Sequence, residues 1–122
     1  MFDEEHKTLL GIMADLQHAI TRHIDERTIR KIVHYLVEYT FTHCRHEEMY
    51  LNDFRYPRAD EHIRQHSEMR TRVLSYYESV RAGEAVKQAP AMLAFLENWL
   101  ITHVQREDKE FGQYLCSRLP GL

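Results

Sequence analysis

The sequence has little of what most specialised protein classes need. Two cysteines among 122 residues, Cys44 and Cys116, are too few for a disulfide framework, so we expect a reducing, cytoplasmic environment. Four glycines and three prolines leave few points at which a helix must end, and no segment alternates like a strand. No apolar run approaches the roughly 20 residues of a membrane span, and the N-terminus lacks a signal-peptide pattern.

The sequence also lacks a large excess of charge of either sign. The formal net charge is -3, and acidic and basic residues are interspersed along the chain. No basic block indicates nucleic acid and no acidic tail indicates a charged partner. With 43% hydrophobic residues, the chain can bury one core, so we expect a single soluble domain over residues 1–122.

Apolar residues recur at steps of three and four, as on one face of a helix. In the first segment, for example, Leu9, Ile12, Leu16 and Ile20 form such a stripe. The pattern predicts four helices, at about 3–23, 26–53, 58–82 and 90–118, with Pro57, Gly83 and Pro90 near their ends. Helices of this length with short connections predict an all-α fold, an antiparallel up-down-up-down four-helix bundle.

Histidine is unusually abundant, and several of the nine histidines lie on the apolar stripes. Each predicted helix contributes histidines or carboxylates to its buried face: His6; His43 and Glu47; His62 and His66; and His103, followed by Glu107 and Asp108. Because neighbouring helices of the bundle run in opposite directions, all four groups fall at the same end of it. We therefore expect them to converge in the core.

Burying so many polar groups without a partner costs several kcal/mol, and a metal ion removes that cost. Five histidines and two carboxylates are too many for one ion but suit two octahedral ions. Imidazole with carboxylate favours iron, manganese or zinc over copper(I). The spacing does not decide which residue supplies the second carboxylate. A four-residue step from His103 favours Glu107, because in an α-helix Asp108 lies about 140° around the axis from His103.

Each feature alone also has a simpler interpretation. One histidine on an apolar face is more often a satisfied core residue, and a His/Glu pair four apart can be an ordinary surface pair. We interpret the other histidines as solvated or flanking and several acids as surface charges: His18, His23, His34, His46, Glu48, Glu61 and Glu68. Cys44 is interpreted as a packing residue. The joint pattern on four helices is what favours a metal centre over a metal-free bundle.

The motifs, taken in order, resemble the hemerythrin family over nearly the whole chain. The opening residues 2–7 (FDEEHK) resemble the family's first-helix motif. His43-x-x-x-Glu47-Glu48, then Tyr56-Pro57 and His62-x-x-x-His66, resembles its central signature, and residues 99–108 (WLITHVQRED) resemble its last-helix signature.

The resemblance implies a non-haem di-iron centre with an oxo or hydroxo bridge. His62, His66 and His103 would hold one iron, His6 and His43 the other, and Glu47 and Asp108 would bridge both, with Glu107 as the rival to Asp108. Counting bonds, the first iron has six ligands and the second has five. The implied function is reversible dioxygen binding at the open position, in a carrier, store or sensor and not in an enzyme.

Candidate walls of the dioxygen pocket are Cys44, Ile63, Met69, Trp99, Leu100 and Val104. The chain departs from the family at Cys44, where an aromatic residue is common, so we expect a wider pocket there. Met1 stands only five residues before His6, so either the family's N-terminal arm is absent or the chain was trimmed, and we expect faster autoxidation than in a relative with the arm.

Two further functions share these residues. The same centre could reduce peroxide or nitric oxide as an enzyme, or serve as the oxygen-sensing part of a larger signalling receptor. Besides dioxygen, we expect no nucleic-acid or membrane partner, and a monomer or weak homo-oligomer. Reversible deoxygenation distinguishes a carrier from an enzyme, which turns over its substrate.

Overall fold

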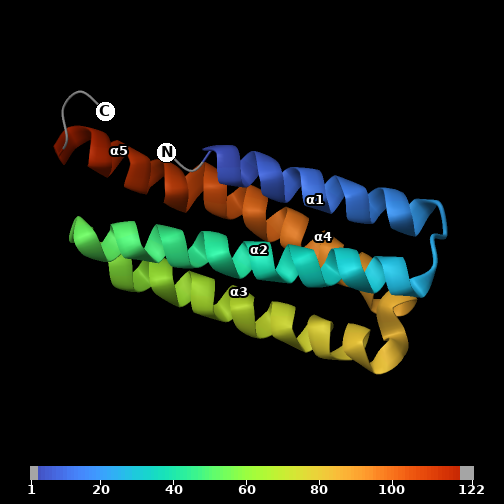
Figure 1. The fold of residues 1–122 in the computed structure, drawn as a ribbon. Helices are drawn as coiled ribbons and strands as arrows, with labels where there is room; N and C mark the ends of the chain where they lie inside the picture. Colours follow the sequence, from blue (N-terminus) through green and yellow to red (C-terminus); the bar gives the residue numbers. More distant parts are fainter. Residues whose placement is uncertain (1–2, 119–122) are drawn as a thin grey trace.

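The computed structural model describes the backbone of residues 3–118 and the side chains from residue 4. This part of the chain is all-α, with no strand, and its long helices lie side by side in a bundle (Figure 1). The helices are α1 (Asp3–Thr21), α2 (Glu26–Asp53), α3 (Ala59–Ser79), α4 (Ala85–His103) and α5 (Lys109–Arg118). The predicted fold class is confirmed.

Successive helices run in opposite directions, and α5 continues the line of α4 (Figure 1). α1 packs against α2 and α4, and α3 packs against the same two helices. The N-terminus of α1, the end of α2, the start of α3 and the end of α4 therefore approach one end of the bundle. This is the end at which the sequence pattern places the histidines.

The core consists of the predicted apolar stripes and divides into two clusters. The larger cluster fills the bundle between α1, α2, α3 and α4, with Leu16, Val33, Leu36 and Val73 fully buried. The smaller cluster lies at the other side of the histidine-bearing level and contains Leu51, Tyr56, Phe111 and Leu115. Polar groups between these clusters are consequently shielded from water on both sides.

Several predicted helix ends were wrong. α1 ends at Thr21, not near His23, which has a left-handed φ of 52°. α3 ends at Ser79, not at Ala82, and Gly83 makes the turn with a φ of 97°, which costs glycine little. The predicted stop at Gly83 is thus four residues beyond the end of α3.

The last helix was predicted from Pro90 and begins five residues earlier, at Ala85. Pro90 lies inside α4, where its missing N–H removes one backbone hydrogen bond. Ala85 and Ala89 are both fully buried, so packing of the first turns against the core offsets that loss. Tertiary contact overrides the local preference here.

A π-helical segment, Val104–Asp108, divides the predicted helix 90–118 into α4 and α5. The wider turn of a π-helix aligns residues five apart, whereas an α-helix aligns residues three or four apart. Such single-turn bulges occur often at functional sites. The segment begins directly after His103 and ends at Asp108.

None of the helices within residues 3–118 is both long and apolar enough to cross a bilayer.

We predict that Leu16→Ala, at a fully buried position of α1, lowers the free energy of unfolding by about 2–5 kcal/mol, because it leaves a cavity in the larger cluster. Leu10→Ala is the matched control, since Leu10 is 50% exposed on the same helix. Urea unfolding followed by circular dichroism measures both. Equal losses for the two variants would contradict this description of the core.

Candidate metal centre

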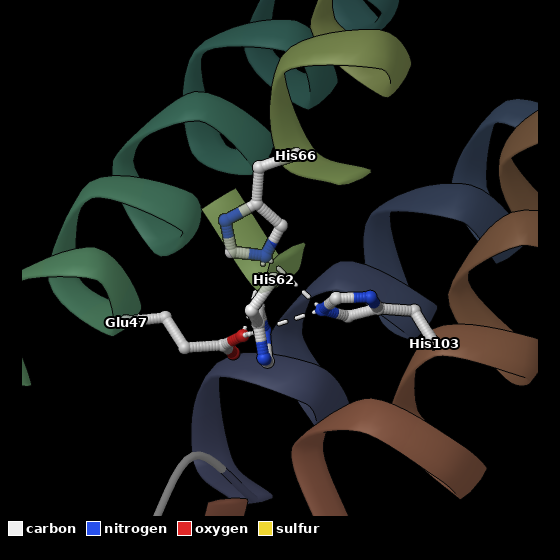
Figure 2. A group of neighbouring side chains, drawn as sticks. All are labelled: Glu47, His62, His66 and His103. Atoms are coloured by element: carbon white, nitrogen blue, oxygen red, sulfur yellow. Dashed lines mark hydrogen bonds and ion pairs between the residues drawn. The ribbon is translucent and has the colours of Figure 1, made fainter. Parts of the chain in front are cut away.

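The structure brings the seven predicted ligands together in one buried cluster. Two groups have ligand atoms within 4.8 Å of one another: Glu47, His62, His66 and His103 form the first, and His6, His43, Glu47 and Asp108 form the second. Figure 2 shows the first group, with the carboxylate from α2, two imidazoles from α3 and one from α4 pointing toward one another. Glu47 belongs to both groups.

In the first group the Nε2 atoms of three histidines face one carboxylate oxygen. Glu47 Oε1 accepts a hydrogen bond from His62 Nε2, and lies 3.2 Å from His66 Nε2 and 3.3 Å from His103 Nε2. His66 Nε2 and His103 Nε2 are themselves 3.0 Å apart. Neutral imidazoles do not have the protons to give every one of these facing nitrogen and oxygen atoms a hydrogen bond. A metal ion, in contrast, can bind the lone pair of each of them.

The second group involves the other carboxylate oxygen of Glu47 and one carboxylate oxygen of Asp108. Glu47 Oε2 lies 3.2 Å from His43 Nε2, and Asp108 Oδ2 lies 3.1 Å from His6 Nε2. Asp108 Oδ1 turns back to the first group, 3.1 Å from His62 Nε2 and 2.9 Å from His103 Nε2. Each carboxylate thus has one oxygen toward each group, as a bridging ligand does.

Four of the carboxylate and imidazole atoms inside the cluster are also buried without a hydrogen bond of acceptable geometry in the part of the chain that the structure describes. They are His6 Nε2, Glu47 Oε2, Asp108 Oδ1 and Asp108 Oδ2. Buried polar atoms are normally paired, and an exception needs an explanation. Metal ligation accounts for all four together.

The π-helical segment decides between Asp108 and Glu107. Because its turn is wider, residue 108 lies above His103, where an α-helix would place residue 107. Glu107 is buried too, but outside both groups, and lies 3.8 Å from the guanidinium of Arg58. The α-helical spacing that favoured Glu107 was the wrong geometry for this turn.

Two carboxylates outside the cluster hold the outer nitrogens of its histidines. Glu5 accepts from His43 Nδ1 at 2.7 Å and from His46 Nδ1 at 2.8 Å, and Glu48 lies 3.2 Å from His66 Nδ1. Such acids fix the tautomer and ring orientation of a ligating histidine. Our prediction of Glu48 as a surface charge was wrong, because Arg70 and His66 hold it in a half-buried position.

The sequence reasoning missed Glu5 altogether, although it lies next to His6 on the same helix. The neighbouring pair Glu47-Glu48 could have indicated one acid inside and one outside the cluster. Other predictions on peripheral residues agree with the structure: His18, His23 and His34 are exposed, and so are His46 and Glu68. Glu61 is only half-buried and pairs with Arg64.

Electrostatics in the cluster favour charged acids and charged imidazoles. Burial opposes both charges, yet the interactions with the Asp108 side chain and with the neighbouring histidines hold the pKa of Glu47 well below its usual range. The pKa of Asp108 is lowered as well: burial and Glu47 oppose this, and His103, His6 and His62 outweigh them. Conversely, burial would lower the pKa of His62, but Asp108 and Glu47 raise it to about 9.

A small apolar cavity adjoins the second group. Its volume is about 10 Å³, counted as the space in which the centre of a water molecule can lie. This is close to the space that one water needs. Its walls are Leu9, Met13, Thr40, His43, Cys44, Leu96, Trp99 and Leu100. Three of the residues expected to line a pocket, Cys44, Trp99 and Leu100, are among them.

The other three candidate pocket residues lie elsewhere. Ile63 packs against the smaller apolar cluster, Met69 is buried in the larger one and Val104 packs at its margin. Trp99 also stacks on His103, with ring centroids 4.3 Å apart and planes 14° apart. The cavity therefore lies between α1, α2 and α4, on the side of His43.

Comparison with known proteins assigns the chain to one family. The profile described as Hemerythrin HHE cation binding domain matches residues 1–115. A bacteriohemerythrin of Stenotrophomonas maltophilia (strain R551-3) is 23% identical over 98% of this chain and 76% of its own length. A bacteriohemerythrin of Pseudomonas paraeruginosa (strain DSM 24068 / PA7) is 28% identical over 88% of this chain and 69% of its own.

We predict that Glu48→Gln destabilises the metal-free protein in a pH-dependent way. Burial would raise the pKa of Glu48, but His66 and Arg70 lower it from 4.5 to about 2. A lowered pKa contributes stability above the unfolded value of 4.5, and this contribution is lost as the pH falls through about 2. The difference between wild type and variant in free energy of unfolding should be constant above about pH 5 and shrink below pH 4.5.

Urea unfolding of metal-free protein between about pH 3 and pH 7 measures that difference. Glu68→Gln is the matched control on α3, because the exposed pair of Glu68 with Arg64 should contribute little. A Glu48→Gln difference that grows on acidification would contradict the arrangement described here.

Proposed function

Because the chain belongs to the hemerythrin family, we propose that its buried histidine–carboxylate cluster holds two iron ions and binds dioxygen reversibly. His62, His66 and His103 would hold one iron, and His6 and His43 the other. Glu47 and Asp108 would bridge them together with an oxo or hydroxo group. When bound, the iron pair supplies the electrons with which dioxygen is taken up and released.

One observation carries this proposal: both acids divide their oxygens between the two groups of histidines. Glu47 and Asp108 each have one oxygen within 3.3 Å of an Nε2 atom in the first group and the other within 3.2 Å of an Nε2 atom in the second. A single metal ion gives no reason for that division. Nitrogen and oxygen donors without thiolate suit iron among the common metals.

The two ends of the cluster have unequal numbers of histidines. Three imidazoles and two shared acids favour a saturated metal ion, whereas two imidazoles with the same acids favour one with an open position. The small apolar cavity borders His43, in the group with fewer histidines. A ligand the size of dioxygen would therefore meet the open position from the cavity.

Residues around the cavity exclude water and keep charge out of it. Its walls are mostly aliphatic and aromatic, and the Cys44 thiol in them is buried. Burial raises the pKa of Cys44 well above its usual value, so the thiol stays neutral and does not compete as a thiolate ligand. An apolar pocket of this kind would keep water and protons away from a small ligand held by the metal pair.

The proposed function predicts the metal content of the protein and the reversibility of oxygen binding. Purified protein should contain about two irons per chain, and its optical spectrum should return to the reduced form on each cycle of deoxygenation. His62→Ala should lose iron, because it removes a fully buried ligand, whereas His18→Ala, at an exposed position, should keep it. Elemental analysis and anaerobic spectroscopy measure both properties.

Protein without a transition metal would overturn the assignment of the cluster as a metal centre. Iron-loaded protein that consumes peroxide or nitric oxide in many turnovers, without a reversible oxygenated spectrum, would instead indicate an enzyme.

A second prediction concerns the cavity. Leu100→Ala should shorten the half-life of the oxygenated protein several-fold, because a larger pocket beside His43 admits water. Ile101→Ala is the matched control, since its side chain is 51% exposed on the same helix. Decay of the visible spectrum in air measures the half-lives. An unchanged half-life for Leu100→Ala would mean that this cavity is not the route to the metal.

A further inference from the structure

A second hollow lies toward the other end of the bundle, far along α2 from the histidine cluster. It has a volume of about 490 Å³ and is lined by Arg27, Arg30, Lys31, His34, Tyr77, Val80 and Arg81. The first four residues lie on one face of α2 at steps of three and four, and the last three come from the end of α3 and the turn after it. Its size is within the range of small-molecule sites, roughly 300–1,000 Å³.

The charge in this hollow has one sign. Arg27, Arg30, Lys31 and Arg81 line it, and no acid does. None of these four cations forms an ion pair within residues 3–118, although other exposed arginines of the bundle, such as Arg58 and Arg64, do. Four cations around one concavity repel one another unless an anion lies between them.

Nearby acids are directed to other partners. Asp25, whose pKa is lowered by Thr28 and in part by Arg27, accepts a hydrogen bond from Thr28 at 2.7 Å. Glu26 accepts from the Ala85 backbone N–H at 3.3 Å, and Glu38 lies 3.1 Å from His34 Nε2 at the margin of the hollow. Each of these three carboxylates thus has another partner, and among the described residues none of them forms an ion pair with a cation of the hollow.

An aromatic ring forms one wall of the hollow. Tyr77 is half-buried, its hydroxyl is hydrogen-bonded to His34 Nδ1, and the Arg81 guanidinium lies 6.0 Å from its ring centroid. The bond to His34 joins α2 to α3 across the hollow and fixes the ring. A flat ring that lines the same hollow as several guanidinium groups is an arrangement that accepts a nucleobase next to phosphates.

We infer that this hollow binds a chain of two or three phosphoryl groups, either free or carried by a nucleotide. Guanidinium groups bind phosphate oxygens in pairs, and the ammonium of Lys31 adds a further charge. Arg27, Arg30 and Lys31 would hold the phosphates along α2, while Arg81 would reach them from the turn after α3. The inference rests on these residues alone and is independent of the metal centre.

Calorimetric titration of the full chain with inorganic tripolyphosphate and with ATP tests the inference. Both should bind, and the double variant Arg30→Gln/Arg81→Gln should weaken the affinity at least roughly tenfold. The matched control is Arg45→Gln/Arg118→Gln. It removes the same charge from exposed positions on α2 and α5, and Arg118 lies 5.2 Å from the Tyr114 ring centroid much as Arg81 lies beside Tyr77.

The outcomes separate the sources of the ligand. Equal affinity for the two probes indicates a free polyphosphate, and tighter binding of ATP indicates a nucleotide whose base contacts Tyr77. Equal weakening in both double variants would show a general charge effect and overturn the inference. No binding at about 5 mM of either probe at low salt, or preferential binding of polyglutamate, would overturn it too.

Discussion

Two carboxylates, Glu47 and Asp108, determine how this protein is built, because each lies in the core with imidazoles on both sides. Such a cluster cannot remain in the interior unless every donor and acceptor has a partner. The surrounding bundle meets this demand with apolar clusters above and below the level of the histidines. The choice of residues at that level and the π-helical turn after His103 can both be understood from the same requirement.

Support for the cluster extends one layer outward and is unequal. Glu5 and Glu48 hold the outer nitrogens of His43 and His66. The Nδ1 atoms of His62 and His103 are buried without such a partner among the described residues. Stacking on Trp99 orients the His103 ring instead. The two groups of ligands therefore differ in the number of histidines and in what holds those histidines in place.

The functional features are separated along the bundle. Buried polar groups and a small apolar cavity lie at one end, and a positively charged hollow lies toward the other, on the start of α2, the end of α3 and the turn after it. Both ends use α2, which at 28 residues is the longest helix of the described chain. One continuous helix thus contributes His43 and Glu47 near its C-terminus and three cations near its N-terminus.

The sequence alone was sufficient for the fold class and for the residues that converge, because both follow from the helical period: apolar positions at steps of three and four define the buried faces, and His43, Glu47, His62 and His66 share those steps. Tertiary structure decided what that period cannot express. α4 begins before Pro90 because Ala85 and Ala89 pack in the core. Glu48, predicted as a surface charge, lies half-buried beside the cluster because it contacts Arg70. A π-turn after His103 turned Asp108, and not Glu107, toward the histidines, because the number of residues in one turn is set by what the turn must pack against.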